Sequence, residues 1–324
     1  MRPSVPLGHY DPSAMDGIEI RVAQPEDFDD IVEVCSASLG WKDPDFDRAL
    51  FRWKHAANPF GRSLIMVAEL DGRLVAVRPF MRWRFRRGDD ILIAARAVDT
   101  ATHPDARGKG LFRTLTEAGI ELLREEGVDF IFNTPNDQSR PGYLKMGWLE
   151  AGQIPVGFRP RSLFTLANLR GARVPATKAS LPMDFGLSVE EGLATATAPD
   201  HRSVDRWVTD HDLSTLRWRF SQGPVTYRWL PGPSGSGVIV RGRRRGTATE
   251  LLLAATVGHS DPGARVGAIS SALQRSNADY CLGPVGYPKM VPVSRLGPLL
   301  TVRTVNTAPR VQDHHWEPGD LELF

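Results

Sequence analysis

The sequence has little of several features that would each indicate a particular class of protein. It contains only two cysteines, Cys35 and Cys281, which lie too far apart for a zinc or redox motif and predict two buried thiols in a reducing compartment. No apolar run is long enough to cross a membrane, so no membrane partner is expected. The net charge of +2 is too small to indicate a nucleic acid as a partner.

The N-terminal residues also lack a feature, the apolar stretch of a secretory signal. Prolines and small polar residues fill residues 1–16, which predicts a flexible arm, and we expect a cytoplasmic protein. His314 and His315 have no partner at the spacing of metal ligands, so no metal is expected. What the sequence does have is 324 residues with 41% hydrophobic and 24% charged residues, which suits two globular domains.

One stretch, from Val98 to Glu126, combines the features of an anion-binding site. An apolar, β-branched run over Ile91–Ala101 predicts a strand, and a basic turn follows with two glycines, Gly108 and Gly110. A helix is predicted next because apolar residues recur at near-helical spacing: Leu111, Leu115, Ala118 and Leu122. The first amides of a helix have no internal partner and favour an anion, and glycine lets the backbone approach it closely. The stretch predicts a phosphate-binding turn, although a solvated turn has the same composition.

The spacing within this turn distinguishes between known phosphate loops. It fits neither GxxxxGK[ST] nor GxGxxG, so the mononucleotide and dinucleotide loops do not apply. It resembles the pyrophosphate loop R/Q-x-x-G-x-G/A of the GNAT acyltransferases, with Pro104 three residues before the arginine of Arg107-Gly108-Lys109-Gly110-Leu111-Phe112. The sequence departs from the family at Phe112, where the pattern has Gly or Ala. Because backbone amides bind the phosphate, a side chain that points into the core is tolerable there.

A second motif follows the next predicted strand, VDFIFN. GNAT proteins commonly carry Asn, then Tyr seven residues later, then Gly-aromatic four and five residues after the tyrosine. Asn136, Tyr143, Gly147 and Trp148 fit that spacing. With two motifs in the right order, the chain is identified as a member of the GNAT superfamily. It is similar to bacterial proteins in which a GNAT domain with an RGKG-[IL]-F loop precedes a degenerate GNAT-like half.

The resemblance implies an α/β (α+β) fold of tandem GNAT-like domains, each a mixed, mostly antiparallel sheet flanked by helices. The expected boundaries are an arm over 1–16, a GNAT domain over 17–162, a linker over 163–180 and a degenerate GNAT-like domain over 181–324. The elements expected in the first domain are a strand at 18–22, helices at 25–38 and 43–57, a hairpin of 63–70 and 74–85, a strand at 90–102, the long helix from 111, the strand VDFIFN, a helix around Tyr143 and a last strand within 148–160.

A faint repeat supports the second domain. FRWKH at Phe51–His55 has a counterpart in LRWRF at Leu216–Phe220, each on a predicted amphipathic helix. The elements expected after it are the strands SGVIVRGRRRG and ELLLAATVG, a helix over Pro262–Asn277, a strand over Tyr280–Leu282 and a helix near Lys289–Leu296. This half lacks the R-x-x-G-x-G spacing, so one cofactor site per chain is expected.

The resemblance also implies acetyl-CoA (coenzyme A) as the cofactor and indicates the residues that hold it. Backbone groups of Thr100, Ala101 and Thr102 would face the pantetheine arm on a splayed strand edge. The pyrophosphate cradle would consist of Arg107, Gly108, Lys109, Gly110, Leu111, Phe112 and Arg113. Asn136 would hold the cofactor, or would only cap the next helix.

Proton transfer needs a donor for the CoA thiolate and a route for the proton of the amine. Tyr143 matches the tyrosine that commonly protonates the thiolate in this superfamily; the alternative is a core tyrosine that closes the last helix onto the sheet. Asp99 is a candidate base, with a buried hydrogen-bonding residue as the alternative. Glu69 and an ordered water are the other candidates for this step.

The C-terminus offers a further source of a base. Leu321-Glu322-Leu323-Phe324 alternates apolar and acidic residues, which predicts a docked terminal strand. Asp320, Glu322 or the terminal carboxylate could then reach the cleft, whereas the alternative strand only completes the second sheet. Five arginines alternate along the predicted strand and turn near residue 80: Arg78, Arg82, Arg84, Arg86 and Arg87. They are expected to form a solvated face, and the alternative is that they bind an acidic substrate.

These residues favour an acetyl-CoA-dependent N-acetyltransferase that acts on a small amine, such as an amino sugar, an antibiotic or another metabolite. A homo-oligomer is compatible with the sequence. Two other functions stay open, a tRNA-dependent aminoacyl transferase of the tandem-GNAT type and a non-catalytic CoA-binding protein. The low net charge and the intact loop speak against the tRNA-dependent transferase.

Overall fold

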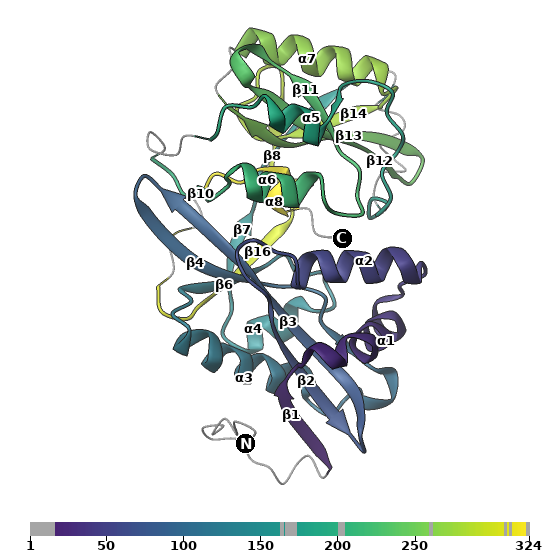
Figure 1. The fold of residues 1–324 in the computed structure, drawn as a ribbon, viewed down its shortest axis with the longest axis vertical. Coiled ribbons are helices and arrows are strands. Elements are labelled where there is room, and N and C mark those ends of the chain that lie inside the picture. The colour runs from purple at the N-terminus through teal and green to yellow at the C-terminus, as the bar shows by residue number, and fades with distance from the viewer. Residues whose placement is uncertain are drawn as a thin grey trace.

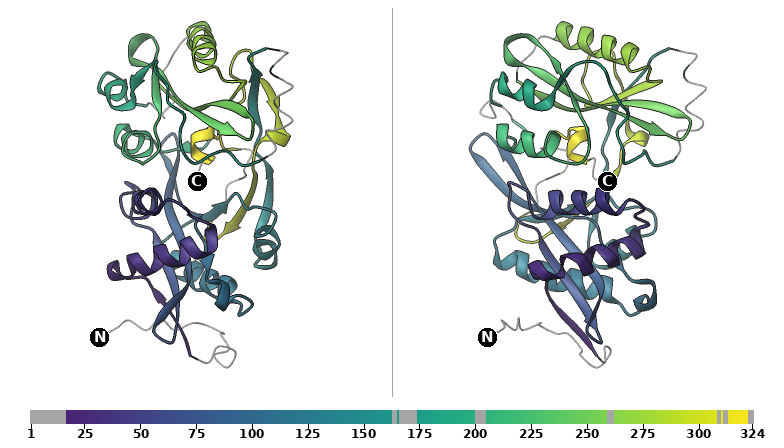
Figure 2. Two further views of the ribbon diagram at one scale, coloured as in Figure 1. Left: turned by 90° about the vertical axis from the view of Figure 1, so that its right-hand side faces the viewer. Right: turned by 45° about the vertical axis from the view of Figure 1, so that its right-hand side comes forward.

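The computed structural model describes residues 17–162, 165, 174–199, 205–258, 262–307, 310 and 313–321. The predicted arm over 1–16 and part of the predicted linker lie outside these residues. Two sheets, each flanked by helices, form two lobes stacked one above the other (Figure 1, Figure 2). Each sheet is mostly antiparallel with one parallel pair of strands, β4 with β6 and β13 with β14, as the resemblance predicts.

The first sheet lies in the lower lobe of Figure 1 and has the strand order β1-β2-β3-β4-β6-β16-β7. Its strands are β1 Ile18–Val22, β2 Leu64–Leu70, β3 Arg73–Arg87, β4 Asp90–Ala97, β6 Phe130–Asn133, β7 Leu149–Gln153 and β16 Leu299–Thr304. The two-residue strands β5 (Ala101–Thr102) and β10 (Val208–Thr209) pair with β3. The predicted hairpin of β2 and β3 turns at Asp71 and Gly72, both left-handed with φ of 51° and 77°, as a tight two-residue turn requires.

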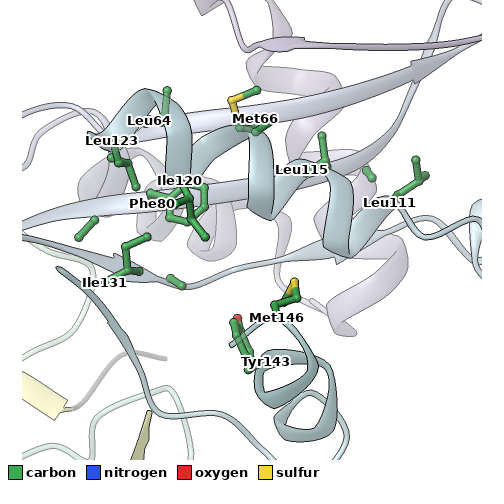
Figure 3. Close-up of a cluster of buried hydrophobic side chains, with 14 of the residues drawn as sticks. Leu64, Met66, Phe80, Leu111, Leu115, Ile120, Leu123, Ile131, Tyr143 and Met146 are labelled. Atoms are coloured by element: carbon green, nitrogen blue, oxygen red, sulfur yellow. The ribbon is translucent and has the colours of Figure 1, made fainter. Parts of the chain in front are cut away.

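Helices cover both faces of the first sheet. They are α1 Phe28–Leu39, preceded by a 3-10 turn at Pro25–Asp27, α2 Pro44–His55, α3 Leu111–Glu125 and α4 Arg140–Lys145. The predicted apolar stripe of α3, with Leu111 and Leu115, packs on β2 and on Phe80 of β3 (Figure 3). At Gly119 a Cβ would lie 2.3 Å from the Phe80 ring, so glycine is required for this close approach. Helix α1 packs on the opposite face, where Val67 and Val77 point.

The second sheet forms the upper lobe and repeats the first in its order, β9-β11-β12-β13-β14-β8-β15. Its strands are β9 Leu187–Ser188, β11 Arg228–Pro231, β12 Gly237–Arg245, β13 Ala248–Val257, β14 Tyr280–Gly283, β8 Val156–Pro160 and β15 Val291–Val293. Its helices are α5 Val189–Ala194, α6 Leu213–Phe220, α7 Pro262–Arg275 and α8 Pro318–Leu321.

Besides the two-residue β10, which pairs with β3, the two sheets exchange one strand each, which the predicted boundaries missed. The strand expected within 148–160 is two strands: β7 stays in the first sheet, but β8 pairs with β14 and β15 in the second. In return, β16 from the C-terminal half lies between β6 and β7 (Figure 1). Pro155 separates β7 from β8 and lacks the amide that would continue a ladder, so the chain can leave one sheet and enter the other there.

The repeated Arg-Trp motif lies where the lobes meet. Trp53 of α2 and Trp218 of α6 stack with ring centroids 5.0 Å apart. The Trp53 Nε1 donates to the Trp218 carbonyl at 2.8 Å, and the Trp218 Nε1 donates to the Trp53 carbonyl at 3.1 Å. This reciprocal pair is what a two-fold relation between the repeats would produce.

Three further predicted elements differ from the structure. The strand over 90–102 breaks after Ala97, because Asp99 has a left-handed φ of 49° that no regular strand accommodates. The helix near Lys289–Leu296 is β15 followed by one 3-10 turn. The predicted terminal strand from Leu321 is wrong for Leu321, because this residue is the last one of the short helix α8. Residues 322–324 lie outside the described part. No helix in the described ranges is long and apolar enough to cross a membrane.

Candidate active site

A cavity of about 730 Å³ opens in the lower lobe beyond the carboxyl ends of β4 and β6. These two strands pair in parallel over Ala94–Arg96 and Phe130–Phe132 and are not paired beyond that point. Four parts of the chain line the cavity. They are the end of α1 with the loop after it (Ser38, Leu39, Trp41), residues 96–100 with Thr102, Arg107 with Phe112, and part of 133–143. Lys178 of the described linker closes one side.

The cavity brings together many, but not all, of the predicted site residues. Asp99, Thr100, Thr102, Arg107, Phe112, Asn136 and Tyr143 all line it. Ala101 is buried in β5 and offers no side chain. Gly108, Lys109, Gly110, Leu111 and Arg113 do not line it but form the adjoining turn and the first residues of α3.

The glycine turn has the backbone conformation that the sequence predicts for a phosphate loop. Gly108 and Gly110 have φ of 80° and 75°, the left-handed region that favours glycine, and neither has an atom within 4 Å of a built Cβ. Gly110 is the N-cap of α3, and the first turn of this helix, which the structure describes completely, contains no acidic residue. Its first amides and helix dipole are therefore available to an anion. Whether a phosphate binds this turn is an open prediction.

Asp99 creates the break in β4 and is held there by α2. Its carboxylate forms an ion pair with Lys54 and a hydrogen bond of 2.9 Å with His55 Nε2, and His55 Nδ1 lies 2.8 Å from Ser63 Oγ. Burial raises the pKa of Asp99, but the charge of Lys54 and the bond from His55 outweigh it and hold the pKa well below its usual range. An ionised carboxylate already paired twice has little tendency to take a proton, which favours the buried hydrogen-bonding alternative for Asp99.

Tyr143 lies on α4, is buried, and is one of the residues that line the cavity. The ring packs edge-on against Phe112 and Trp148, with centroids 5.2 and 4.7 Å away. The Arg78 Nη1 donates to its hydroxyl oxygen at 2.8 Å. Both predicted roles are thus compatible with the geometry, because Tyr143 belongs to the core and also lines the cavity.

Asn136 organises the turn that precedes α4. Its Oδ1 accepts from the amide and from the hydroxyl of Ser139, both at 2.9 Å. The N-cap itself is Ser139, so Asn136 caps the turn before the helix. Its position in the cavity wall leaves the predicted cofactor contact open.

Arg78 is a functional candidate that the sequence prediction assigned wrongly. It was expected on a solvated face, but it is completely buried, because α3 covers one face of β3 at this point and α1 and α2 cover the other. The other four arginines of that series are partly exposed and pair with carboxylates: Arg82 with Glu126, Arg84 and Arg86 with Asp210, and Arg87 with Asp90. The one signal for Arg78 in the sequence is its place two residues before Phe80 in an otherwise apolar run.

Those of the other proposed bases that the structure describes, Glu69 and Asp320, do not line the cavity. Glu69 pairs with Arg21 at 3.1 Å on the outer part of the sheet. Asp320 is buried and lies 3.3 Å from His211 Nε2. Its backbone does approach the cavity, since Arg96, which lines it, donates to the carbonyls of Asp320 and Leu321. Glu322 and the terminal carboxylate lie outside the described residues.

The equivalent place in the second lobe is closed by the chain itself. Thr100 and Thr256 are equivalent, because each lies six residues after the first residue of the parallel pairing (94 to 100, 250 to 256). Thr256 stays in β13, and its amide donates to Glu317 Oε1 at 2.8 Å. Burial raises the pKa of Glu317 to about 8. A C-terminal segment thus covers the edge that is open at Thr100.

Sulfur and metal chemistry find no support in the described part of the chain. Cys35 and Cys281 are both buried, as predicted, and burial raises the pKa of each thiol, which disfavours the reactive thiolate. No group of three His, Cys, Asp or Glu side chains in these residues is arranged to hold a metal ion.

Comparison with known proteins identifies the first lobe. Residues 19–151 match the family model described as an acetyltransferase (GNAT) domain. Residues 19–151 are a GNAT domain. Those matched residues include the glycine turn, Asp99 and Tyr143, while a search of curated proteins found no match to the chain.

Solved structures share the fold of both lobes. A probable N-acyltransferase from Enterococcus faecalis V583 is 11% identical, covering 89% of this chain and 73% of that one with a TM-score of 0.61. A GCN5-related N-acetyltransferase from Anabaena variabilis is 13% identical over the same shares, with a TM-score of 0.58. Eis1 from Mycobacterium abscessus is 15% identical over the same shares, with a TM-score of 0.54. At these identities the likeness establishes the GNAT-like fold alone.

Proposed function

We propose that this GNAT protein is an acetyl-CoA-dependent N-acetyltransferase that acts on a small-molecule amine. The observation that carries the proposal is that Tyr143, the strand break at Asp99 and the turn that leads into α3 border one cavity. A cofactor cradle, an unpaired strand edge and a proton donor are the parts that direct acyl transfer from a thioester needs.

The residues present fit coenzyme A. The glycines of the turn leave open space, the first turn of α3 has no acidic side chain, and Arg107 adds a positive charge at the cavity. These groups would hold the pyrophosphate, and the backbone of Val98–Thr100, which belongs to no strand, would face the pantetheine arm. Acetyl-CoA would supply the acyl group as a thioester. Dependence on this cofactor also favours the cytoplasm as the compartment.

Tyr143 is proposed to give its proton to the departing sulfur. A guanidinium has only donors, so the phenol oxygen accepts from Arg78 and its own hydrogen points away from Arg78. Asp99 is not needed as a base in this scheme, because its pKa is too low; an amine that arrives neutral can release its proton to water.

The charges around the cavity favour a small acceptor that is not a polycation. The side chains that line it include three cations, Arg96, Arg107 and Lys178, and one carboxylate, Asp99, which is already paired with Lys54 and His55. A polycationic acceptor would thus find no free carboxylate among these lining residues. We propose neither a nucleic acid nor a membrane as a partner; self-association remains compatible with the structure.

An amine panel tests this proposal. The purified protein is incubated with acetyl-CoA and single amines, and thiol release is recorded. Turnover with at least one small amine is expected, and Tyr143→Phe should lower kcat by about 10²–10⁴-fold, the usual contribution of one acid–base group, with little change in acetyl-CoA affinity. Tyr10→Phe, in the N-terminal segment, is the control.

The two alternatives predict other results. A non-catalytic CoA-binding protein would bind acetyl-CoA but release no thiol with any amine in the panel. An aminoacyl transferase would show turnover only with charged tRNA and would carry no CoA in mass spectrometry of the purified protein. A Tyr143→Phe variant that loses only cofactor binding would mark this tyrosine as structural.

A further inference from the structure

The side chain of Arg78 has surroundings that are unusual for an arginine. It is 0% exposed, and its guanidinium touches two oxygens, the Tyr143 hydroxyl at 2.8 Å and Thr100 Oγ1. Three aromatic rings surround it, with Phe80, Phe112 and Tyr143 centroids 4.8, 5.4 and 5.2 Å from its Cζ. It therefore joins β3, the break after β4 and helix α4 at the wall of the cavity.

This buried cation has no anionic partner in the part of the chain that the structure describes. Its Nε and Nη2 are buried without a hydrogen-bond partner there, and its only oxygen contacts are two neutral hydroxyl groups. A buried charge is costly unless a counter-charge compensates it, and aromatic faces compensate only in part. An anion that forms close to Arg78 would therefore be stabilised strongly, since the cation is desolvated and already in place.

We propose that Arg78 is a positioning residue, which directs the Tyr143 hydroxyl toward the reacting sulfur and is the counter-ion of the Tyr143 phenolate. The inference rests on the proposed function and adds a residue to it. Arg78 itself touches neither substrate nor cofactor in this scheme. It acts through the 2.8 Å bond to the Tyr143 oxygen.

The movement of protons and electrons during acyl transfer explains this role of Arg78. The amine nitrogen forms a bond to the acyl carbon, the carbon–sulfur bond breaks, and its electron pair goes to sulfur. The O–H bond of Tyr143 breaks, its proton goes to sulfur, and a phenolate remains beside Arg78. The proton that the amine nitrogen loses passes through water to the phenolate, so Tyr143 is restored and no net proton is consumed. Arg78 stays protonated throughout, as guanidinium does in proteins.

Arg78→Met is the main test, because methionine fills similar apolar space without charge or donors. We expect kcat to fall by about 10²-fold or more, the loss typical of one preorganised donor to a developing anion, with KM for acetyl-CoA changed by less than a few-fold. The double variant with Tyr143→Phe should be no slower than Tyr143→Phe alone, since Arg78 acts only through that oxygen. Arg82→Met, on the same strand but paired with Glu126 at the surface, is the matched control.

A measurement without turnover tests the counter-ion directly. Ultraviolet titration of the tyrosines, with the Tyr143→Phe protein subtracted, isolates the Tyr143 phenolate. This phenolate should form at higher pH in Arg78→Met than in the wild-type protein, because the cation that stabilises it is gone. If Arg78→Met does not fold, Arg78→Gln removes the charge but keeps donors, and Arg78→Lys should restore part of the activity.

Three results would overturn the inference: unchanged kcat in the neutral variants, full additivity with Tyr143→Phe, or an unchanged phenolate titration. These outcomes differ from failure of the proposed function. If Tyr143→Phe itself leaves turnover intact, proton donation by Tyr143 is wrong; if only the Arg78 variants keep wild-type kcat, Tyr143 keeps its role and Arg78 loses its own.

Discussion

Single polar residues in this protein are held in very different ways, and their surroundings decide what each can do. Asp99 is ionised because the charge of Lys54 compensates its own and His55 donates a hydrogen bond to it. Glu317 sits in an equally buried place with one amide donor, from Thr256, and the repulsion of Asp320, so its pKa is raised to about 8. The same chemical group is thus a fixed anion at the open edge of the first sheet and a neutral acid at the closed edge of the second.

Replacement of Glu317 by glutamine should change how stability depends on pH. The pKa of Glu317 is 4.5 ordinarily and about 8 in the fold. Between these values the unfolded chain loses the proton while the folded chain keeps it, so the contribution of Glu317 is full below pH 4.5 and is lost as pH rises toward 8. Glutamine keeps the acceptor for the Thr256 amide but does not titrate.

The measurement is the melting temperature of both proteins across this range. The difference, Glu317→Gln minus wild type, should become steadily more favourable to the variant from about pH 4.5 to about pH 8 and then level off. Glu121→Gln, an exposed residue on α3, should show no such trend. A difference that is flat with pH, or that falls as pH rises, would contradict the raised pKa of Glu317.

At the scale of the element, helix α3 and the turn before it form one unit. Both ends of α3 have a left-handed glycine in open space, Gly110 at the start and Gly127 just beyond the end, with φ of 75° and 74°. Replacing either glycine by another residue should therefore cause the same backbone strain. Only Gly110 lies where the helix dipole favours an anion. Comparing variants at the two glycines therefore distinguishes an effect on cofactor binding from an effect on stability.

Gly110→Asp should weaken binding of acetyl-CoA at least about 10-fold, because a carboxylate would occupy the positive end of α3 and repel the pyrophosphate. Calorimetry on the wild-type protein should show one site per chain. Gly110→Ala and Gly127→Ala should lower the melting temperature alike, and Gly127→Ala should leave affinity unchanged. Two equal sites per chain, or equal affinity in Gly110→Asp, would count against the cofactor cradle.

Elements with a strong local period could be predicted from the sequence, and properties set by distant contacts could not. Strand β1, the β2-β3 hairpin and helix α3 follow from apolar spacing and turn residues, with ends within a few residues of the structure. The break at Asp99 was missed because its cause, the contacts with α2, is remote in sequence. Arg78 was misassigned for the same reason: arginine is rarely buried, and only the packing of helices on both faces of β3 buries it.

At the scale of the whole molecule, the strand exchange makes the two halves depend on each other. Each sheet needs a strand from the other half between its last two strands. Local pattern predicts a strand that contains β8, whereas β16 was not predicted. Both sheets have equivalent places for these strands, and only the complete fold decides between the places. The tryptophan pair of α2 and α6 adds a second contact across the same boundary.

The predicted first domain, residues 17–162, should therefore not fold alone. Without β16 the strands β6 and β7 lose their common neighbour, and β8 becomes an unpaired apolar segment. The expected result for this fragment is aggregation or a melting curve with no cooperative transition. A rewired fragment, residues 17–153 joined by a two-residue turn to 299–307, should melt cooperatively, because Gln153 lies directly opposite Leu299 and a tight turn can connect them. Cooperative melting of residues 17–162 as they stand would instead show that β16 is dispensable. Residues 17–162 would then be an independently folding domain, with the boundary predicted from the sequence.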